Sequence, residues 1–299
     1  MFAHVNRRQF LGAMAGGATA GGTGLGGYAF AGEPRFRLAI TRYDLAVPGW
    51  QPDAPPLTIA VLSDIHACEP WMPAARVAWI AKHALKLQPD MILLLGDYVG
   101  GVEPFDTGDV PGPEWAAALG MLTAPLGVHA VVGNNDWAVD IDEVRRLLAE
   151  QDIPVYENDA VKIEKDGHSF WLAGLGDQAG SPKAAGQRDK LADLSGTLAQ
   201  VTDNDPVILM AHEPDIFVRV PERVSLTLSG HTHGGQVRIP FFGPPIVPSD
   251  YGRRFAYGHV VEEGRHLVVT GGLGCANLPV RFMVPPEIVL ITLKAAVVA

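Results

Sequence analysis

Several histidine, aspartate and asparagine residues in this sequence stand directly after short apolar runs. The densest case is Ser229 to Gly235, where His231 and His233 lie one residue apart between glycines. Ser and Asp are common in any turn after a strand, so one such motif would be ordinary. Five motifs share the pattern, however, and together they contribute Asp64, His66, Asp97, Asn134, His212, His231 and His233.

The chemistry of these seven side chains favours a metal centre. Carboxylate, carboxamide and imidazole ligands without a thiolate suit manganese, iron or zinc. Seven groups are too many for one four-coordinate ion. Two divalent ions about 3.5 to 4 Å apart, bridged by a carboxylate, would use them all and leave positions for water and substrate.

The apolar runs before these motifs are predicted to be buried β-strands. Residues 58–62, 91–95, 128–132 and 207–210 are almost uniformly apolar, as strands of a sheet covered on both faces must be. In such sheets, ligands gather beyond the carboxyl ends of the strands. We therefore expect the seven side chains to converge at one sheet edge.

The order of the motifs, D-x-H, GD, GN, H and G-H-x-H, resembles that of the calcineurin-like metallophosphoesterases over about residues 55 to 295. The chain looks most similar to the bacterial branch of exported and membrane-associated phosphodiesterases that includes some UDP-2,3-diacylglucosamine pyrophosphate hydrolases. The resemblance implies an α/β fold, a four-layer αββα sandwich of two mixed β-sheets flanked by helices. It assigns the first ion to Asp64, His66 and His233, the second to Asn134, His212 and His231, and the bridge to Asp97.

The resemblance also implies a reaction. A metal-bound hydroxide would attack phosphorus in line with the leaving oxygen, and two cations would neutralise the charge that develops there. The expected substrate is a phosphodiester or a pyrophosphate, including a lipid-linked one. Two alternatives stay open: a phosphomonoesterase of the same fold, and a metal-binding relative without turnover.

Two positions depart from the family pattern. The family commonly has His after GN, where this chain has Asn135 followed by Asp136. A carboxamide donates hydrogen bonds but delivers no proton at neutral pH. Asn135 therefore predicts either a slower enzyme on poor leaving groups or a substrate that needs little acid assistance, such as a pyrophosphate. The second departure is Gly100, where many relatives carry the last Asp of GDxxD. Asn135 and Asp136 are the candidate catalytic side chains, and no substrate-binding residue is identified.

The amino terminus predicts export. Asn6 to Leu11 contains a twin-arginine pattern, and Ala29 to Ala31 has the small residues of a cleavage site, so residues 1–31 are predicted to be a signal peptide and 32–299 the metallophosphoesterase domain. The partner would be the twin-arginine export machinery, and the location periplasmic or otherwise extracytoplasmic, with membrane association. A G-x-G-x-x-G match at Gly22 to Gly27 lacks a preceding strand and is rejected as a dinucleotide site.

Composition sets further bounds. A formal net charge of -10 argues against duplex nucleic acid as a partner. The two cysteines, Cys68 and Cys275, form no disulfide framework, and Cys68 is best interpreted as a buried thiol. Two apolar loops, 69–73 and 240–245, follow the first and last ligands. If exposed, they would meet acyl chains or a membrane surface in a peripheral contact.

Periodicity and turn residues predict the remaining elements. A hairpin across 160–173 should turn at Asp166 and Gly167, and strands 255–261, 266–270 and 287–293 should complete a second sheet. The other expected strands are 36–44, 57–62, 91–95, 128–132, 207–210 and 224–229, and the expected helices are 73–87, 113–123, 140–150 and 186–200.

Overall fold

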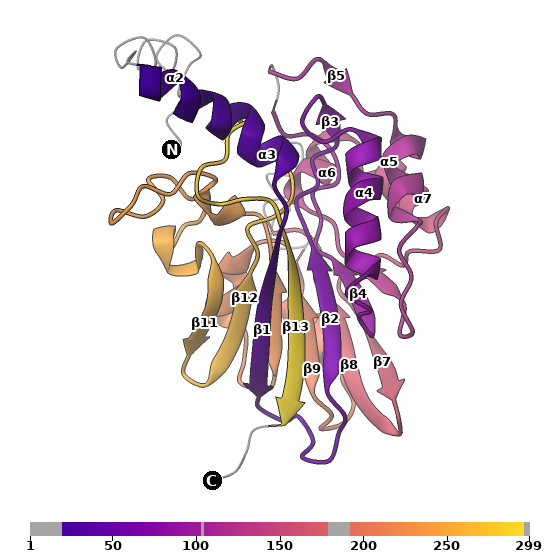
Figure 1. Ribbon diagram of the computed structural model, residues 1–299. Coiled ribbons are helices and arrows are strands. Elements are labelled where there is room, and N and C mark those ends of the chain that lie inside the picture. The colour runs from indigo at the N-terminus through magenta and orange to yellow at the C-terminus, as the bar shows by residue number, and fades with distance from the viewer. Residues whose placement is uncertain (1–19, 103–104, 179–191, 296–299) are drawn as a thin grey trace.

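The computed structural model describes residues 20–102, 105–178 and 192–295. Two large sheets lie face to face, with helices against the outer face of the first (Figure 1). The first sheet has the strand order β1-β13-β2-β4-β6, and the second has the order β11-β12-β10-β9-β8-β7. These strands are β1 Ala39–Val47, β2 Leu57–Leu62, β4 Met91–Leu94, β6 Val128–Ala130, β7 Asp159–Lys165, β8 His168–Gly174, β9 Val207–Met210, β10 Leu226–Ser229, β11 Gly258–Glu262, β12 Arg265–Val269 and β13 Glu287–Ala295.

Both sheets are mixed, as predicted. Strands β2, β4 and β6 run parallel, and so do β8, β9, β10 and β12. A third ribbon pairs β3 (Cys68–Glu69) with β5 (Gly108–Asp109). The carboxyl ends of β2 and β4 lie at the upper end of the molecule in Figure 1.

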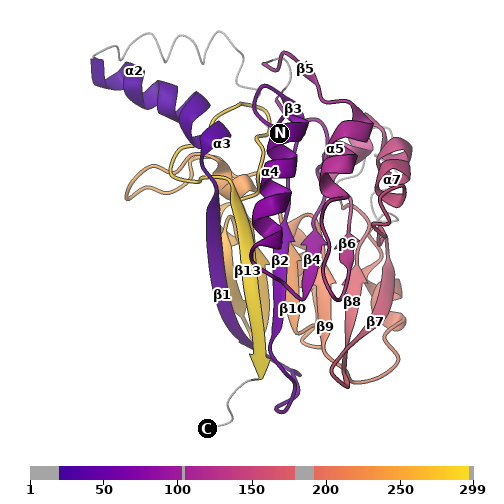
Figure 2. The ribbon, with the colours of Figure 1, turned by 45° about the vertical axis from the view of Figure 1, so that its right-hand side comes forward.

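Three hydrophobic layers hold the sandwich together. Ile59, Leu93 and Leu228 belong to the core between the two sheets, whereas Leu62 and Ile92 face the helices of the first sheet. Figure 2 shows α4, α5 and α7 side by side over that sheet. The outer face of the second sheet packs mainly against a 3₁₀ helix and a short α9. The helices are α4 Ala74–Leu85, α5 Gly112–Leu119, α6 Asn134–Val139, α7 Ile141–Ala149, α9 Leu194–Ala199 and the 3₁₀ segments Pro214–Arg219, His233–Gly235 and Gly252–Phe255.

The expected four-layer arrangement of mixed sheets flanked by helices is confirmed, although its fourth layer is thin among the described residues. The hairpin is also confirmed, because Asp166 and Gly167 both have positive φ, at 51° and 82°. Such values give a turn whose twist matches that of paired strands.

One strand assignment was wrong. The prediction placed 287–293 in the second sheet, but β13 lies in the first sheet, parallel to β1 and antiparallel to β2. Its residues Glu287 to Ile291 are all buried, as expected of a strand with neighbours on both sides. Periodicity marks such a strand as interior without saying which sheet contains it.

Other differences concern boundaries. The first strand begins at Ala39 instead of 36, because residues 33–36 continue a helix, and the strand extends to Val47. The helix expected over 113–123 ends at Leu119. Of the helix expected over 186–200, residues 186–191 lie outside the described residues, and the described part begins at Leu194.

A helical segment precedes the first strand. It comprises α2 Ala20–Gly27, a π-helical turn Tyr28–Gly32 and α3 Glu33–Phe36. Residues 1–19, with the twin-arginine pattern, lie outside the described residues, and the division at residue 31 stays a prediction. Among the described residues, no helix combines the length and apolarity needed to cross a bilayer.

Candidate metal centre

The carboxyl edge of the sheets brings together six of the predicted side chains. Two groups could each hold a cation, Asp64 with His66 and His233, and Asp97 with His212 and His231, and within each group the ligand atoms lie within 4.8 Å of one another. The two groups also touch. Nε2 of His66 lies 3.1 Å from Nε2 of His233 and 3.6 Å from Oδ2 of Asp97. Asp97 Oδ2 is also 3.2 Å from Nε2 of His212, so this carboxylate lies between the two groups.

The backbone at these residues is strained. Asp64, His66, Asp97, His231 and His233 have φ values of 54°, 47°, 57°, 65° and 51°. Non-glycine residues seldom adopt this left-handed conformation, which costs on the order of 1–3 kcal/mol for each residue. The surrounding fold sustains that cost at five of the six positions. This concentration marks the edge as a functional site.

Close approach of backbone to side chain explains the glycines of the motifs. A Cβ atom at Gly133 would lie 2.3 Å from Oδ1 of Asp97 and 2.7 Å from Cε1 of His212. At Gly230, it would lie 2.0 Å from Oγ of Ser63 and 2.5 Å from Oδ2 of Asp64. Any larger residue would displace the ligands, so these glycines let the motifs converge.

Backbone carbonyls orient two of the imidazoles. Nδ1 of His66 lies 3.1 Å from the carbonyl oxygen of Gly100, and Nδ1 of His212 lies 2.6 Å from that of Leu95. Because the carbonyl oxygens accept, each Nδ1 carries a proton and each Nε2 faces the centre. Nε2 is therefore the atom that would bind a metal, once it carries no proton.

Charge is closely balanced inside the centre. Burial, reinforced by His212, lowers the pKa of His231 to about 3. Burial also holds the pKa of His233 well below its usual range. Although burial alone would lower it, the Asp97 carboxylate raises the pKa of His212 well above its usual range, and the same pairing lowers the pKa of Asp97. Burial therefore favours the neutral imidazoles of His231 and His233, whereas Asp97 favours the charged imidazole of His212.

The side-chain oxygen of Asn134 indicates whether the second group of ligands suits a cation. Its Oδ1 is buried and accepts no hydrogen bond from any residue that the structure describes. A buried, unpaired carbonyl oxygen costs about 1–3 kcal/mol, unless a ligand meets it. The backbone on both sides of Asn134 approaches Asp97, at Gly133 and at Asn135, and an amide oxygen added to carboxylates and imidazoles gives a donor set suited to a hard or borderline divalent cation. The residues present fit two such ions.

The two departures from the family pattern lie side by side. Asn135 donates from its backbone N to Asp97 Oδ1 at 2.9 Å and from Nδ2 to Asp97 Oδ2 at 2.7 Å. A Cβ atom at Gly100 would lie 3.4 Å from Asn135 Cβ and Oδ1. The carboxamide thus holds the central carboxylate, and the absence of a side chain at Gly100 leaves that carboxamide without an acidic neighbour from this position.

Asp136 acts behind the centre. Its carboxylate accepts hydrogen bonds from the backbone N of Asp97 and of Gly133, each at 2.9 Å, and from that of Tyr98 at 2.8 Å. Burial and the neighbouring Asp97 raise the pKa of Asp136 to about 7, in spite of these donors. Asp136 thereby ties the GD loop to the GN loop, which is a positioning role.

Sequence reasoning missed a buried acidic pair beside the second group. Asp177, three residues beyond β8, and Glu213, next to His212, are 1% and 6% exposed. Burial, together with Asp177, raises the pKa of Glu213 to about 8. The signal was available, because β8 is another strand that ends at the same edge and runs parallel to β9. The hairpin predicted over 160–173 did not extend to the residues after its second strand, where Asp177 lies.

Arg281 is fully buried behind the first group of ligands. Its guanidinium donates to the carbonyl oxygens of Gly274 and Val284, and its Nη2 lies 3.2 Å from Nδ1 of His233. The arginine therefore supports a ligand from behind. Cys68 and Cys275 are free, buried thiols, and burial raises the pKa of Cys68 to about 12.

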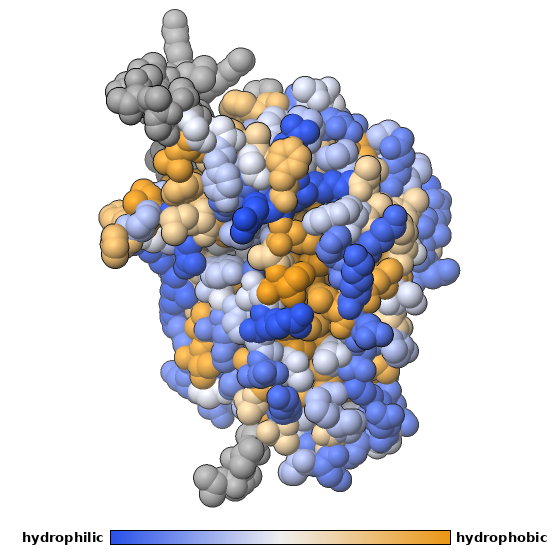
Figure 3. Space-filling model, in the orientation of Figure 1, coloured by the Kyte–Doolittle hydropathy of each residue, from blue (hydrophilic) through white to orange (hydrophobic). Residues whose placement is uncertain are grey.

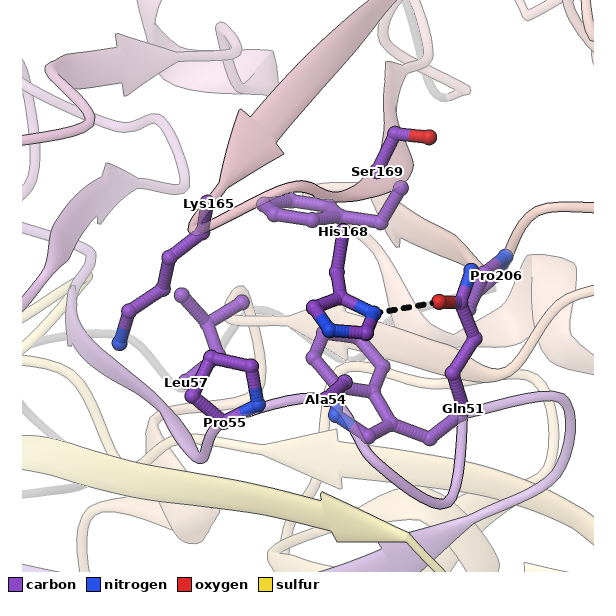
Figure 4. A pocket seen from close by; sticks show the side chains of 10 residues that line it. Gln51, Ala54, Pro55, Leu57, Lys165, His168, Ser169 and Pro206 are labelled. Atoms are coloured by element: carbon purple, nitrogen blue, oxygen red, sulfur yellow. Dashed lines mark hydrogen bonds between the residues drawn. The ribbon is translucent and has the colours of Figure 1, made fainter.

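A small pocket lies at the other end of the sheets. It has a volume of about 10 Å³, and its walls include Trp50, Leu57 and Phe170. Figure 4 shows His168 within it, with Nδ1 2.6 Å from Oε1 of Gln51. A space of this volume holds no more than one water molecule, and it is remote from the metal groups.

The chain is similar to proteins named as metallophosphoesterases or phosphodiesterases over most of its length. A family model described as calcineurin-like phosphoesterase matches residues 57–235. Metallophosphoesterase YkuE of Bacillus subtilis (strain 168) is 31% identical, over 97% of this chain and 98% of YkuE. A metallophosphoesterase of Aquifex aeolicus (strain VF5) is 30% identical, over 81% of this chain and 87% of its own. Phosphodiesterase YaeI of Escherichia coli (strain K12) is 30% identical, over 97% of this chain and 99% of YaeI.

Proposed function

Because the chain belongs to the calcineurin-like phosphoesterases, we propose that it hydrolyses phosphodiesters or pyrophosphates at a centre of two divalent cations. Membership of the family makes it a metal-dependent phosphoester hydrolase. The observation that carries the finer proposal is the contact between the two ligand groups, with Asp97 between them. The similarity to YaeI, which is named a phosphodiesterase, supports the substrate class.

The cations, when bound, would lower the pKa of attacking water and neutralise the charge that develops at phosphorus. This chain's residues would hold and orient them. Asp64, His66 and His233 would bind the first ion, Asn134, His212 and His231 the second, and Asp97 both. The donor set suits manganese, iron or zinc.

Asn135 bears on the substrate. Its carboxamide would donate a hydrogen bond near the centre without delivering a proton, so the leaving group must depart with little acid assistance. A phosphate leaving from a pyrophosphate meets that requirement, as does an acidic alcohol leaving from a diester. Asn135 therefore favours pyrophosphates, and diesters of acidic alcohols, over monoesters of ordinary alcohols.

Export by the twin-arginine route is part of the proposal. It is supported by the sequence of residues 6–11, and it would place the enzyme outside the cytoplasm, where lipid-linked phosphoesters of the envelope are accessible. Proteins on this route cross the membrane folded, which suits a centre assembled from loops on two sheets.

Hydrolysis of model esters tests the function. Protein loaded with Mn²⁺ or Zn²⁺ should hydrolyse bis(p-nitrophenyl) phosphate with a higher kcat/KM than p-nitrophenyl phosphate, and chelation should remove both activities. A preference for the monoester would favour the phosphomonoesterase alternative. No turnover of either ester, with metal bound, would favour a non-catalytic metal-binding protein.

A further inference from the structure

Large apolar side chains are exposed beside the metal centre. Phe241, Phe242 and Ile246 are 112%, 58% and 66% exposed, and Phe36 is 72% exposed. We call this surface the apolar rim. It consists of Ile239, Phe241, Phe242 and Ile246 in the loop after the last ligand motif, together with Met283 and Phe36, and all six residues follow the predicted signal peptide.

Hydrogen bonds make the apolar rim continuous. Arg238 N donates to the carbonyl oxygen of Phe282 at 2.9 Å, which joins the loop to the segment carrying Met283. Val284 N donates to Oε1 of Glu33 at 2.8 Å, which joins that segment to the helical one that ends at Phe36. Figure 3 shows apolar residues gathered at the upper left, over the loop and the helical segment.

The loop presents its aromatic side chains in a fixed turn. Ile239 N donates to the carbonyl oxygen of Gly243 at 3.0 Å, and Gly243 N donates to that of Ile239 at 2.8 Å. Phe241 lies at the tip with a φ of 64°. Two prolines, Pro244 and Pro245, follow and stiffen the return. Aromatic side chains held outward by a closed turn leave apolar area in water, which is typical of a surface that a partner covers.

The arginine side chains around the apolar rim indicate which kind of partner covers it. Arg238 stacks on Tyr257 at 5.0 Å and Arg253 on Phe242 at 4.5 Å, and in the described part of the chain neither guanidinium pairs with a carboxylate. Arg37 is exposed beside Phe36 in the helical segment. Positive charge around apolar side chains, on a chain with a net charge of -10, complements an anionic lipid surface. We propose that the apolar rim docks on a bilayer of anionic phospholipid.

The docked surface would lie next to the metal groups. The loop begins directly after His233, and a Cβ atom at Gly235 would lie 2.5 Å from Cβ of Pro244, so the turn packs against the ligand motif itself. Docking would therefore bring a headgroup phosphoester beside the centre without extracting the lipid. Only this last step rests on the proposed function, because binding to the bilayer needs no turnover.

Vesicle binding tests the proposal. Full-length protein should co-sediment with phosphatidylglycerol vesicles, and amides of residues 238–247 should gain protection from hydrogen exchange when the vesicles are added. The F241S/F242S variant should bind at least about 10-fold more weakly, because two aromatic side chains no longer enter the interface. The R238Q/R253Q variant should lose about 30-fold in affinity for anionic vesicles, but little for phosphatidylcholine vesicles.

A matched control variant and a soluble substrate distinguish a failure of the docking proposal from a failure of the proposed function. Val261→Ser removes an apolar side chain that is 52% exposed on β11, away from the rim, and should bind like the wild type. F241S/F242S should hydrolyse bis(p-nitrophenyl) phosphate normally. Unchanged vesicle binding by F241S/F242S, or no protection at 238–247, would overturn the docking surface. Vesicle binding without hydrolysis of any ester would leave the docking surface standing and reject the proposed function.

Discussion

The two ends of the sheets carry similar polar residues in opposite circumstances. At the amino ends, Asp90 accepts hydrogen bonds from N and Oγ1 of Thr58, each at 2.7 Å, and from Nζ of Lys165 at 2.6 Å. At the carboxyl ends, Asp97 meets two imidazoles and an amide. Asp64 likewise lies 3.4 Å from Nε2 of His233.

The difference separates structural polar groups from functional ones. Protein partners complete the charge balance at Asp90 on a partly exposed surface, where such pairs contribute little. The carboxyl edge carries carboxylates, imidazoles and the unpaired amide oxygen of Asn134. Five of these ligand residues have a positive φ, a backbone conformation that costs free energy. In the proposed function, cations would complete that set. The following predictions test the contrast, beginning with the largest effect.

Replacing one aspartate at each end should give opposite phenotypes. Asp97→Asn removes a charge shared by both metal groups, so metal retention should be lost and kcat/KM for bis(p-nitrophenyl) phosphate should fall at least about 1,000-fold, or about 4 kcal/mol. Asp90→Asn should cost about 1 kcal/mol of unfolding free energy and leave metal content unchanged. Metal analysis, kinetics and urea titration measure these effects. Retention of metal and activity by D97N would remove the contrast.

Glycine substitutions compare the backbone at the two ends of the sheets. Gly133→Ala should lower metal affinity at least about 10-fold, because its Cβ would lie 2.3 Å from Asp97 Oδ1. Gly167→Ala, in the hairpin at the amino edge, meets no atom within 4 Å. It should cost only about 1–2 kcal/mol for its positive φ, without affecting metal. Equal metal affinities in the two variants, measured by isothermal titration, would contradict this account.

The GD and GN loops should depend on Asp136. Asp136→Asn replaces an acceptor for four backbone amides by a group with one acceptor atom, so kcat should fall by about 10- to 100-fold. Rescue by Asp136→Glu would be poor, because the buried space is fixed. A normal kcat with D136N, in protein of normal metal content, would show that the amides need no carboxylate.

Metal binding should release protons near neutral pH. Asp97 raises the pKa of His212 well above its usual range, so in the metal-free protein this imidazole is charged at pH 7 and must lose a proton to bind a cation. Affinity should therefore increase with pH until the pH exceeds that pKa. His231, with a pKa of about 3, contributes no release at pH 7. Calorimetry in buffers of different ionisation enthalpy counts the protons, and no release at pH 7 would refute the charged His212.

The smallest effect is expected at Asn135. Asn135→His should change kcat for the diester by less than about 10-fold, because Gly100 provides no acidic partner to orient the imidazole. Kinetics on diester and monoester substrates measure it. Activity that appears only in N135H would mean that the natural chain binds metal without turnover.

Much of this organisation could be predicted from the sequence. Uniformly apolar runs identify strands covered on both faces, and parallel strands bring their carboxyl ends to one edge, so Asp64, Asn134 and His212 could be placed together. The turn at Asp166 and Gly167 has a local cause and was also predictable. These features depend on short segments whose physics does not need the rest of the fold.

Long-range packing could not be predicted in the same way. The position of β13 between β1 and β2 is decided by pairing across about 250 residues, which periodicity does not encode. The strand end before Asp177 could be recognised in the sequence, but the burial of Asp177 and Glu213 side by side follows from the assembled fold. The hydrogen bonds from Arg281 and Val284 to the helical segment likewise appear only in three dimensions.

Anomalous diffraction from crystals grown with Mn²⁺ or Zn²⁺ tests the central claim most directly. Two anomalous peaks about 3.5 to 4 Å apart should lie within the six carboxylate and imidazole side chains, with Asp97 between them and Asn134 Oδ1 on the second. An empty carboxyl edge at saturating metal, or peaks bound to surface carboxylates elsewhere, would contradict the two-cation centre.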